Sequence, residues 1–324
     1  MSLRVPTSTT YSRLERSLST SLGRVQDLQG QLSSGSRINK LSDDPAGAAT
    51  GMRLRAQETD WTAYQGTADD AKAILATTDS TLQQSSILLT RVRELAISSV
   101  SGALGPEERA AIGAQVADLR SQLLDLANTT HLGRAVFGGH QANAVRQTAP
   151  GQPAVPGSAG PPAVAPVPAT PPTFGFVGDS GVVSRQVSPS VTLAANVPGQ
   201  AVFGFDQPPV NSAPQDVFSV LGRLELAVRD GNNAAIAAEQ AGLATRTSAV
   251  LVGMGEIGAK MNRVTTASEL GSQIRDRLLE HRSEVEDVDL AAAIVRMQAA
   301  QNSYTAALGA VARADLPSLA NFLR

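Results

Sequence analysis

Apolar side chains recur every three or four residues along the start of the chain. From Tyr11 to Leu32 they take six steps over 21 residues, a mean step of 3.5, and almost every position between them is polar. This is the period of a helix that shows one narrow apolar stripe to a neighbouring helix. Because such a helix is marginal alone, the pattern predicts a long N-terminal helix that needs a partner.

The far end of the chain has the same spacing. From Leu290 to Val311 the apolar positions are again three or four residues apart, with Gln301 at the one polar exception. We predict that the two ends pair as a coiled coil; the alternative is that each end packs on its own nearest domain. The predicted assembly seam consists of Leu14, Leu18, Leu22, Val25, Leu28, Ile294, Met297, Tyr304, Leu308 and Val311.

Further helical patterns lie between the two ends. Apolar and small residues at the same spacing predict one long helix through 61–96 and another through 250–278. A helix also begins at Gly105–Pro106, where proline fits the first turn, and a shorter one follows Pro214. The segment LSSGSRINKLSDDPAGAATG, residues 32–51, interrupts these patterns with turn-forming residues.

The middle of the chain has a different composition. Fourteen of the eighteen prolines lie between Pro150 and Pro214, and residues 150–172 are of low complexity, so we expect them to be extended or disordered. Short β-like runs follow at 173–178, 181–187, 190–197 and 200–205. The sequence therefore predicts a mainly α protein with a small β insert.

Composition excludes several classes of function. The formal net charge of −2 gives no general support for binding nucleic acid, and the absence of cysteine rules out disulfides and thiolate chemistry. No apolar run is long enough to suggest a membrane span, and the N-terminus has no cleaved-signal pattern. We expect a soluble protein that is either cytoplasmic or exported by a route without such a signal.

Candidate chemical motifs are weak. GMGEIG, residues 253–258, fits a dinucleotide-binding pattern, but the helical stripe runs through it. GDSG, residues 178–181, has no suitably placed histidine base, and the three histidines lack metal-ligand spacing. The carboxylates of 284–289 are interpreted as a solvated helix face. We predict no catalytic residue, no cofactor and no metal.

Longer stretches carry a resemblance to a known family. LSSGSRINKLSDDPAGAA is similar to the hallmark segment of bacterial flagellins and their relatives, and PSLANFLR resembles their common C-terminal end. Residues 119–139 and 183–205 look more like the members at the hook–filament junction than like filament flagellin. Pro45 stands where filament flagellins more often have alanine.

The resemblance implies a location and a set of partners. Such proteins are exported unfolded through the flagellar type III apparatus and assemble outside the cell. The expected partners are further copies in a ring, a neighbouring hook-associated protein, filament flagellin, and a cytoplasmic export chaperone at the C-terminal segment. Neither nucleic acid nor membrane is expected as a partner.

The resemblance also suggests a division into three parts. These are a terminal coiled-coil domain (1–42 with 285–324), a helical rod domain (43–140 with 212–284), and a linker with a small β domain at the tip (141–211). The segment 32–51 becomes the joint between the first two parts, because one stiff continuous helix could not offset an inner from an outer layer. Its predicted residues are Gly35, Arg37, Asp43, Asp44 and Pro45.

The leading interpretation is a structural, non-enzymatic subunit at the hook–filament junction. The alternative within the family is filament flagellin. Outside it, a nicotinamide-dependent oxidoreductase that uses GMGEIG and a secreted coiled-coil effector are both less well supported.

Overall fold

The computed structural model describes residues 7–101, 104–149, 170–207 and 215–314. Within them the helices are α1 (Thr7–Ser34), α2 (Pro45–Ser101), α3 (Pro106–Ala127), α4 (Gly199–Phe203), α5 (Val217–Arg229), α6 (Asn233–Glu286) and α7 (Leu290–Ala314). The strands are β1 (Thr130–His131), β2 (Arg134–Ala135), β3 (Val145–Ala149), β4 (Thr173–Phe176), β5 (Ser184–Ser188) and β6 (Val191–Ala194). The protein is mainly helical, as predicted.

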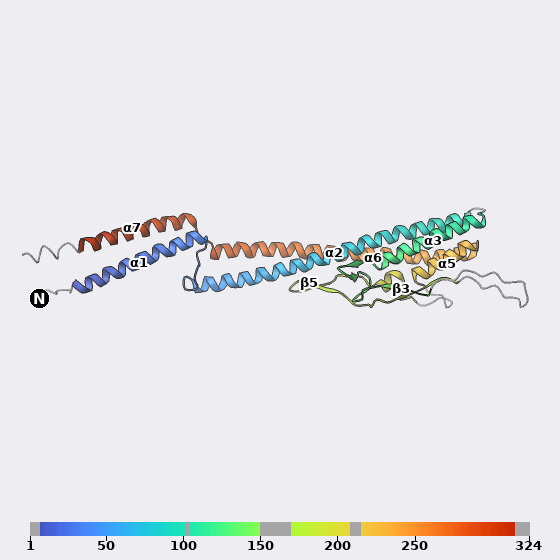
Figure 1. Cartoon of the computed structure of the whole chain (residues 1–324), viewed down its shortest axis with the longest axis horizontal. Coiled ribbons are helices and arrows are strands. Elements are labelled where there is room, and N and C mark those ends of the chain that lie inside the picture. The colour runs from blue at the N-terminus through green and yellow to red at the C-terminus, as the bar shows by residue number, and fades with distance from the viewer. Residues whose placement is uncertain (1–6, 102–103, 150–169, 208–214, 315–324) are drawn as a thin grey trace, which may run out of the picture. The chain divides into compact units, whose positions relative to one another are not determined.

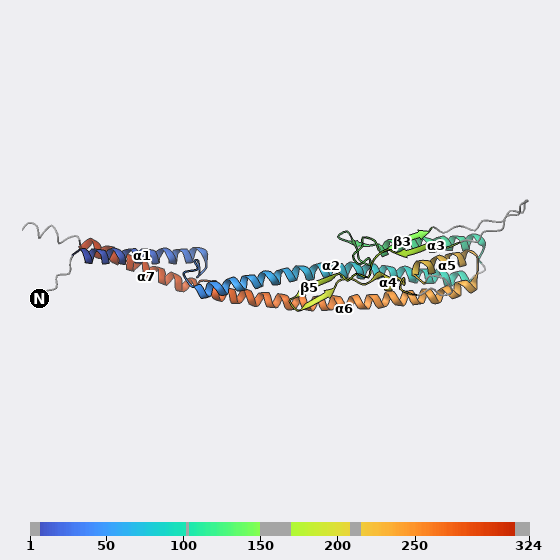
Figure 2. The ribbon, with the colours of Figure 1, turned by 90° about the horizontal axis from the view of Figure 1, so that it is seen from below.

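The chain forms two compact units, each described here by itself. The terminal unit consists of the described residues before position 63 and after position 272, and it contains α1, α7 and the adjoining ends of α2 and α6. The central unit spans 63–272. Figures 1 and 2 show α2 and α6 side by side in both views.

Local sequence explains where the helices begin and end. Gly35, directly after α1, has φ +70°, a conformation that glycine adopts without steric cost. At the start of α3, the backbone N–H of Gly105 donates to the Glu108 carboxylate at 2.9 Å, and Pro106 takes the first helical position. The GMGEIG segment lies inside α6, so the strand–turn–helix that a dinucleotide site needs is not formed there.

The core of the central unit lies between long helices. Its largest fully buried aliphatic side chains come from α2, α3, α5 and α6: Leu75, Leu82, Leu89, Leu123, Leu221, Leu224, Ile236, Leu243 and Ile257. Phe218 of α5 extends this core toward the strands, with its ring centroid 5.7 Å from that of Phe203. An ion pair between Arg120 of α3 and Glu225 of α5, at 2.6 Å, joins the two shorter helices beside it.

The strands form three separate antiparallel pairs, β1 with β2, β3 with β4 and β5 with β6. Within the described residues these pairs do not merge into a larger sheet. The prediction of a strand at 200–205 is wrong, because most of this segment belongs to α4. The helix ends at its C-cap Gly204, which has φ +81°. Burial of Phe203 against Phe137, at 5.2 Å between ring centroids, fixes the helical turn.

Two further differences concern the same region. The hairpin of β1 and β2 and the strand β3 are absent from the sequence prediction, which placed the first strand after the low-complexity stretch. Most of that stretch, 150–169, lies outside the described residues, as does the C-terminal PSLANFLR.

Among the helices described, none is both long and apolar enough to cross a lipid bilayer.

The β5–β6 pair is attached to the long helices by polar contacts. Arg185 Nε donates to Asp70 Oδ2 on α2 at 2.8 Å. Thr67 Oγ1 donates to the Gln186 carbonyl at 2.6 Å, and Lys260 Nζ of α6 donates to the Asn196 carbonyl at 2.7 Å. These contacts set the position of the pair along α2 and α6.

Candidate functional site: the terminal helices and their joint

The two terminal helices lie side by side in the terminal unit. Both views show α1 and α7 as neighbours, although α1 ends at Ser34 and α7 begins only at Leu290 (Figures 1 and 2). On α7 the most buried positions are Ala293 and Ala300, with 1% and 7% of their surface exposed. Alanine at these positions lets the helix backbones approach closely. The half-buried large side chains of the predicted seam are Leu18, Val25, Leu28, Met297, Tyr304 and Val311.

The rest of the predicted seam faces solvent in the single chain. Leu22 of α1 is 40% exposed, and Ile294 and Leu308 of α7 are 46% and 42% exposed. Leu14 lies in α1 outside the part of that helix whose side chains the structure describes. The α1–α7 pair thus buries part of the predicted seam within the chain and leaves other large apolar side chains of it open to solvent. We call the residues Leu22, Ile294 and Leu308 the open stripe.

Beside this helix pair, the two connecting segments bind each other. The Arg37 N–H donates to the Glu286 carbonyl at 2.6 Å, and the Val288 N–H donates to the Gly35 carbonyl at 3.0 Å. Ser36 Oγ also donates to the Glu286 carbonyl, at 3.1 Å. The link between α1 and α2 is therefore held by main-chain bonds to the link between α6 and α7.

The Arg37 side chain strengthens this connection. Its Nη2 donates to the Val285 carbonyl at 2.7 Å, and its Nη1 is 3.2 Å from Asp44 Oδ2. Asp44 in turn caps α2, because its Oδ1 accepts the Gly47 N–H at 2.9 Å and Pro45 takes the first helical position. The Gly47 N–H, together with Arg37, holds the pKa of Asp44 below its usual value.

Asp43 shapes the turn before this cap. Its Oδ2 accepts the N–H groups of Asn39 and Lys40, at 3.2 and 2.9 Å. All five residues predicted for the joint thus lie in one connected segment, and the side chains of Arg37, Asp43 and Asp44 each make a defined contact in it.

Sequence reasoning missed the residue around which this joint is organised. The carboxylate of Glu286 is only 13% exposed and pairs with Arg55 of α2 at 2.7 Å, so the interpretation of 284–289 as a solvated face is wrong for this residue. Gly51 lies directly against it, and a side chain there would collide with the Glu286 carboxylate. Asp289 is also structural, because its Oδ1 accepts the Ala292 N–H at the start of α7. This contact could not be predicted from residue spacing, because Gly51 and Glu286 are far apart along the chain.

The arrangement suits association with other helices. Histidine, aspartate and glutamate side chains do not gather in threes at a metal-binding geometry in the part of the chain that the structure describes. What the terminal unit offers is a pair of helices with an open apolar stripe, held at one end by a hydrogen-bonded joint.

Comparison with known proteins gives a match at each end of the chain. The model of the bacterial flagellin N-terminal helical region matches residues 5–141, and that of the C-terminal helical region matches residues 244–323. Flagellar hook-associated protein 3 of Salmonella typhimurium is 24% identical over 93% of this chain and 95% of its own length. Flagellin A of Vibrio cholerae is 32% identical, but over only 41% of this chain and 35% of its own length.

Solved structures show the same fold. FlgL of Bacillus cereus covers 71% of this chain and 99% of its own, with a TM-score of 0.55 and 21% sequence identity. The flagellar junction protein FlgL of Legionella pneumophila covers 73% and 99%, with a TM-score of 0.52 and 15% identity. Matched at both its N-terminal and its C-terminal helical regions, the chain belongs to the bacterial flagellin family.

Proposed function

We propose that this chain is a structural subunit of the bacterial flagellum that acts as an adaptor at the hook–filament junction. The observation that carries the proposal is the extent of similarity. The match to hook-associated protein 3 spans 93% of the chain and includes the middle region, whereas the flagellin match covers 41%. No enzymatic activity is part of the proposal.

The open stripe supplies the physical basis for assembly. Fully burying a large apolar side chain contributes about 1.5–3 kcal/mol. Leu22, Ile294 and Leu308 are less than half exposed, so burying the rest of each against neighbouring copies would contribute about half of that and favour a multi-chain particle. In that particle α1 and α7 act as an inner coiled-coil domain, 1–42 with 285–324. The helical regions 43–140 and 212–284 form a rod, and 141–211 projects as the tip.

The proposed partners are those that the similarity to flagellar proteins implies. Copies of the chain associate in a ring, with a neighbouring hook-associated protein on one side and filament flagellin on the other. The subunit reaches its extracellular position through the flagellar type III apparatus, and a cytoplasmic chaperone holds the C-terminal segment before export.

A deletion experiment tests the proposal. Cells that lack this chain should build hooks without filaments and should release monomeric flagellin into the medium, because the filament has nothing to attach to. Electron microscopy of the cell surface and analysis of the medium measure the two effects. Filaments of normal length on the deletion cells would refute the junction role.

The match to the flagellin N-terminal region and the 32% identity to flagellin A support one alternative, filament flagellin itself. The two functions differ in the behaviour of purified protein. A filament flagellin grows into long filaments when seeded, whereas a junction adaptor stops after a short ring. Negative-stain microscopy of the purified chain separates them.

A further inference from the structure

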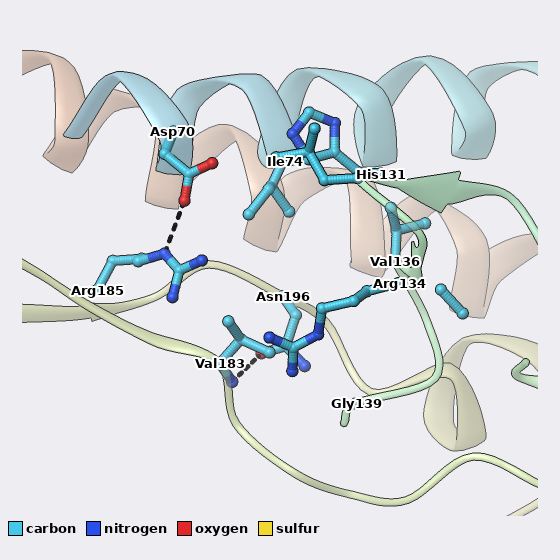
Figure 3. A pocket seen from close by; sticks show the side chains of 11 residues that line it. Asp70, Ile74, His131, Arg134, Val136, Gly139, Val183, Arg185 and Asn196 are labelled. Atoms are coloured by element: carbon cyan, nitrogen blue, oxygen red, sulfur yellow. Dashed lines mark hydrogen bonds and ion pairs between the residues drawn. The ribbon is translucent and has the colours of Figure 1, made fainter. Parts of the chain in front are cut away.

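A small cavity in the central unit is unrelated to the terminal helices. It has a volume of about 170 Å³ and opens between α2, the β1–β2 hairpin and the segment around β5 and β6 (Figure 3). Ile74, Val136 and Val183 form apolar walls. Arg134 and Arg185 reach into the same space from different strands.

Only one of the two guanidinium charges is neutralised by another described residue of the chain. Arg185 is neutralised by Asp70 at 2.8 Å. Arg134 makes no ion pair or hydrogen bond with any part of the chain that the structure describes. The cavity therefore has one positive charge left over, beside an apolar wall, and it is suited to a carboxylate carried on an apolar surface.

The size and the rim of the cavity indicate what kind of molecule carries that carboxylate. Pockets for small molecules usually have volumes of about 300–1,000 Å³, so this one holds a side chain rather than a metabolite. At its rim Leu132 is 84% exposed and has φ +51°, which is costly for a residue with a branched side chain. This exposed apolar side chain next to the cavity is available to contact another macromolecule.

The same unit carries a surface with the complementary character. Glu269 and Leu270 of α6 are adjacent and exposed, the leucine by 54%. Glu269 has no partner among the described residues, in contrast to Glu94 and Glu256, which pair with Arg91 and Lys260 on their own helices.

The position of Glu269 suits a contact between copies arranged side by side. Gln65 Nε2 donates to Ser272 Oγ at 3.1 Å, so Glu269 lies within about a turn of Asp70 along the α2–α6 pair. Lys260 points to the cavity rim at Asn196, and Glu269 follows it by nine residues, or about two and a half turns. Glu269 therefore faces the opposite side of α6 from the cavity, at a similar height.

We propose that the cavity beside Arg134 receives Glu269 of a second copy of this chain, while Leu132 packs against Leu270 of that copy. Two different patches on opposite sides make a heterologous contact, the kind that closes into a ring when the rotation allows it. The inference rests on the self-association proposed above and names the surfaces that make it.

Charge reversal tests the contact in cells that lack the native chain. Arg134→Glu and Glu269→Arg, introduced separately, should each reduce incorporation of the chain into flagella more than about tenfold, because a like-charge pair replaces the attraction. The double variant Arg134→Glu/Glu269→Arg should restore incorporation, since the charges are exchanged. Immunoblots of isolated flagella quantify the chain, and circular dichroism of the purified variants checks that they fold.

Glu94 provides the control, because it is also an acidic residue on an exposed helix face. Arg134→Glu/Glu94→Arg should remain defective. Rescue by Glu94→Arg, or normal incorporation of Arg134→Glu alone, overturns the assignment and leaves the junction role intact. If the unmodified chain is itself not needed for filaments, the junction role fails instead.

In that case cross-linking still decides the contact. Since the chain has no native cysteine, Arg134→Cys and Glu269→Cys can be joined by a short bismaleimide, which should yield covalent oligomers in isolated flagella. Absence of oligomers, with both cysteines modified, contradicts the contact.

Discussion

Burial and helix capping have opposite effects on the pKa of Asp216. It begins α5, where its Oδ1 accepts the Ser219 N–H at 2.9 Å, and it is only 3% exposed. Burial raises the pKa of Asp216 above its ordinary value of 3.8, although the bonds from Ser219 lower it. The ionised carboxylate therefore reduces stability, and the reduction is absent below the unfolded pKa and develops as pH rises through the folded pKa.

Asparagine at this position keeps the cap without the charge. Asp216→Asn should have a higher free energy of unfolding than the native chain at pH 7, and the difference should shrink as the pH is lowered below about 4. Asp216→Ala should be about 1 kcal/mol less stable than Asp216→Asn at every pH, because it loses the cap as well as the charge. Urea denaturation at a series of pH values measures both, and a pH-independent difference for Asp216→Asn would show that its charge is not the cause.

At the scale of elements, the segment between α1 and α2 and the segment between α6 and α7 stabilise each other through the joint. Arg37→Ala removes the bond to the Val285 carbonyl and the pair with Asp44, so α1 and α2 should lose part of their attachment to the end of α6. We expect a loss of about 1 kcal/mol in local stability, because the guanidinium is 45% exposed and water partly replaces its bonds.

Lys40 is a matched control in the same segment. Its pair with Asp27 is 68% and 64% exposed and stabilises little, so Lys40→Ala should have no measurable effect. Hydrogen exchange of the backbone amides at 35–48 and 285–289 reports the difference. Equal exchange in the two variants would mean that Arg37 does not hold the joint.

For the whole molecule, the open stripe separates folding from assembly. Leu308 is 42% exposed in the single chain, so Leu308→Asp should leave helix content and thermal unfolding unchanged. The same change should abolish incorporation into flagella, since each buried leucine contributes about 1.5–3 kcal/mol and a charge in its place must be desolvated. Motility and immunoblots of isolated flagella measure the loss.

Gln298→Asp, at an exposed position of the same helix, controls for added charge. It should incorporate normally. Normal motility with Leu308→Asp would show that the open stripe is not an assembly surface.

The sequence by itself determined the long helices, because apolar period and capping residues are local properties of the chain. Gly105 followed by Pro106 was enough to predict where α3 begins, and the apolar stripes were enough to predict that α1 and α7 need partners. The same kind of local pattern gave a wrong prediction at 200–205. The apolar run there is typical of a strand, but it forms α4 because Phe203 packs against Phe137.

Only the tertiary structure decided which apolar residues are buried and which polar residues meet. A stripe at 3.5-residue spacing does not say which of its members face a helix of the same chain, so Val25 and Leu22 could not be distinguished until α7 lay beside α1. Glu286 with Arg55, and the cavity beside Arg134, depend on contacts between residues more than fifty positions apart. Such contacts are set by how the elements pack, and no local period encodes them.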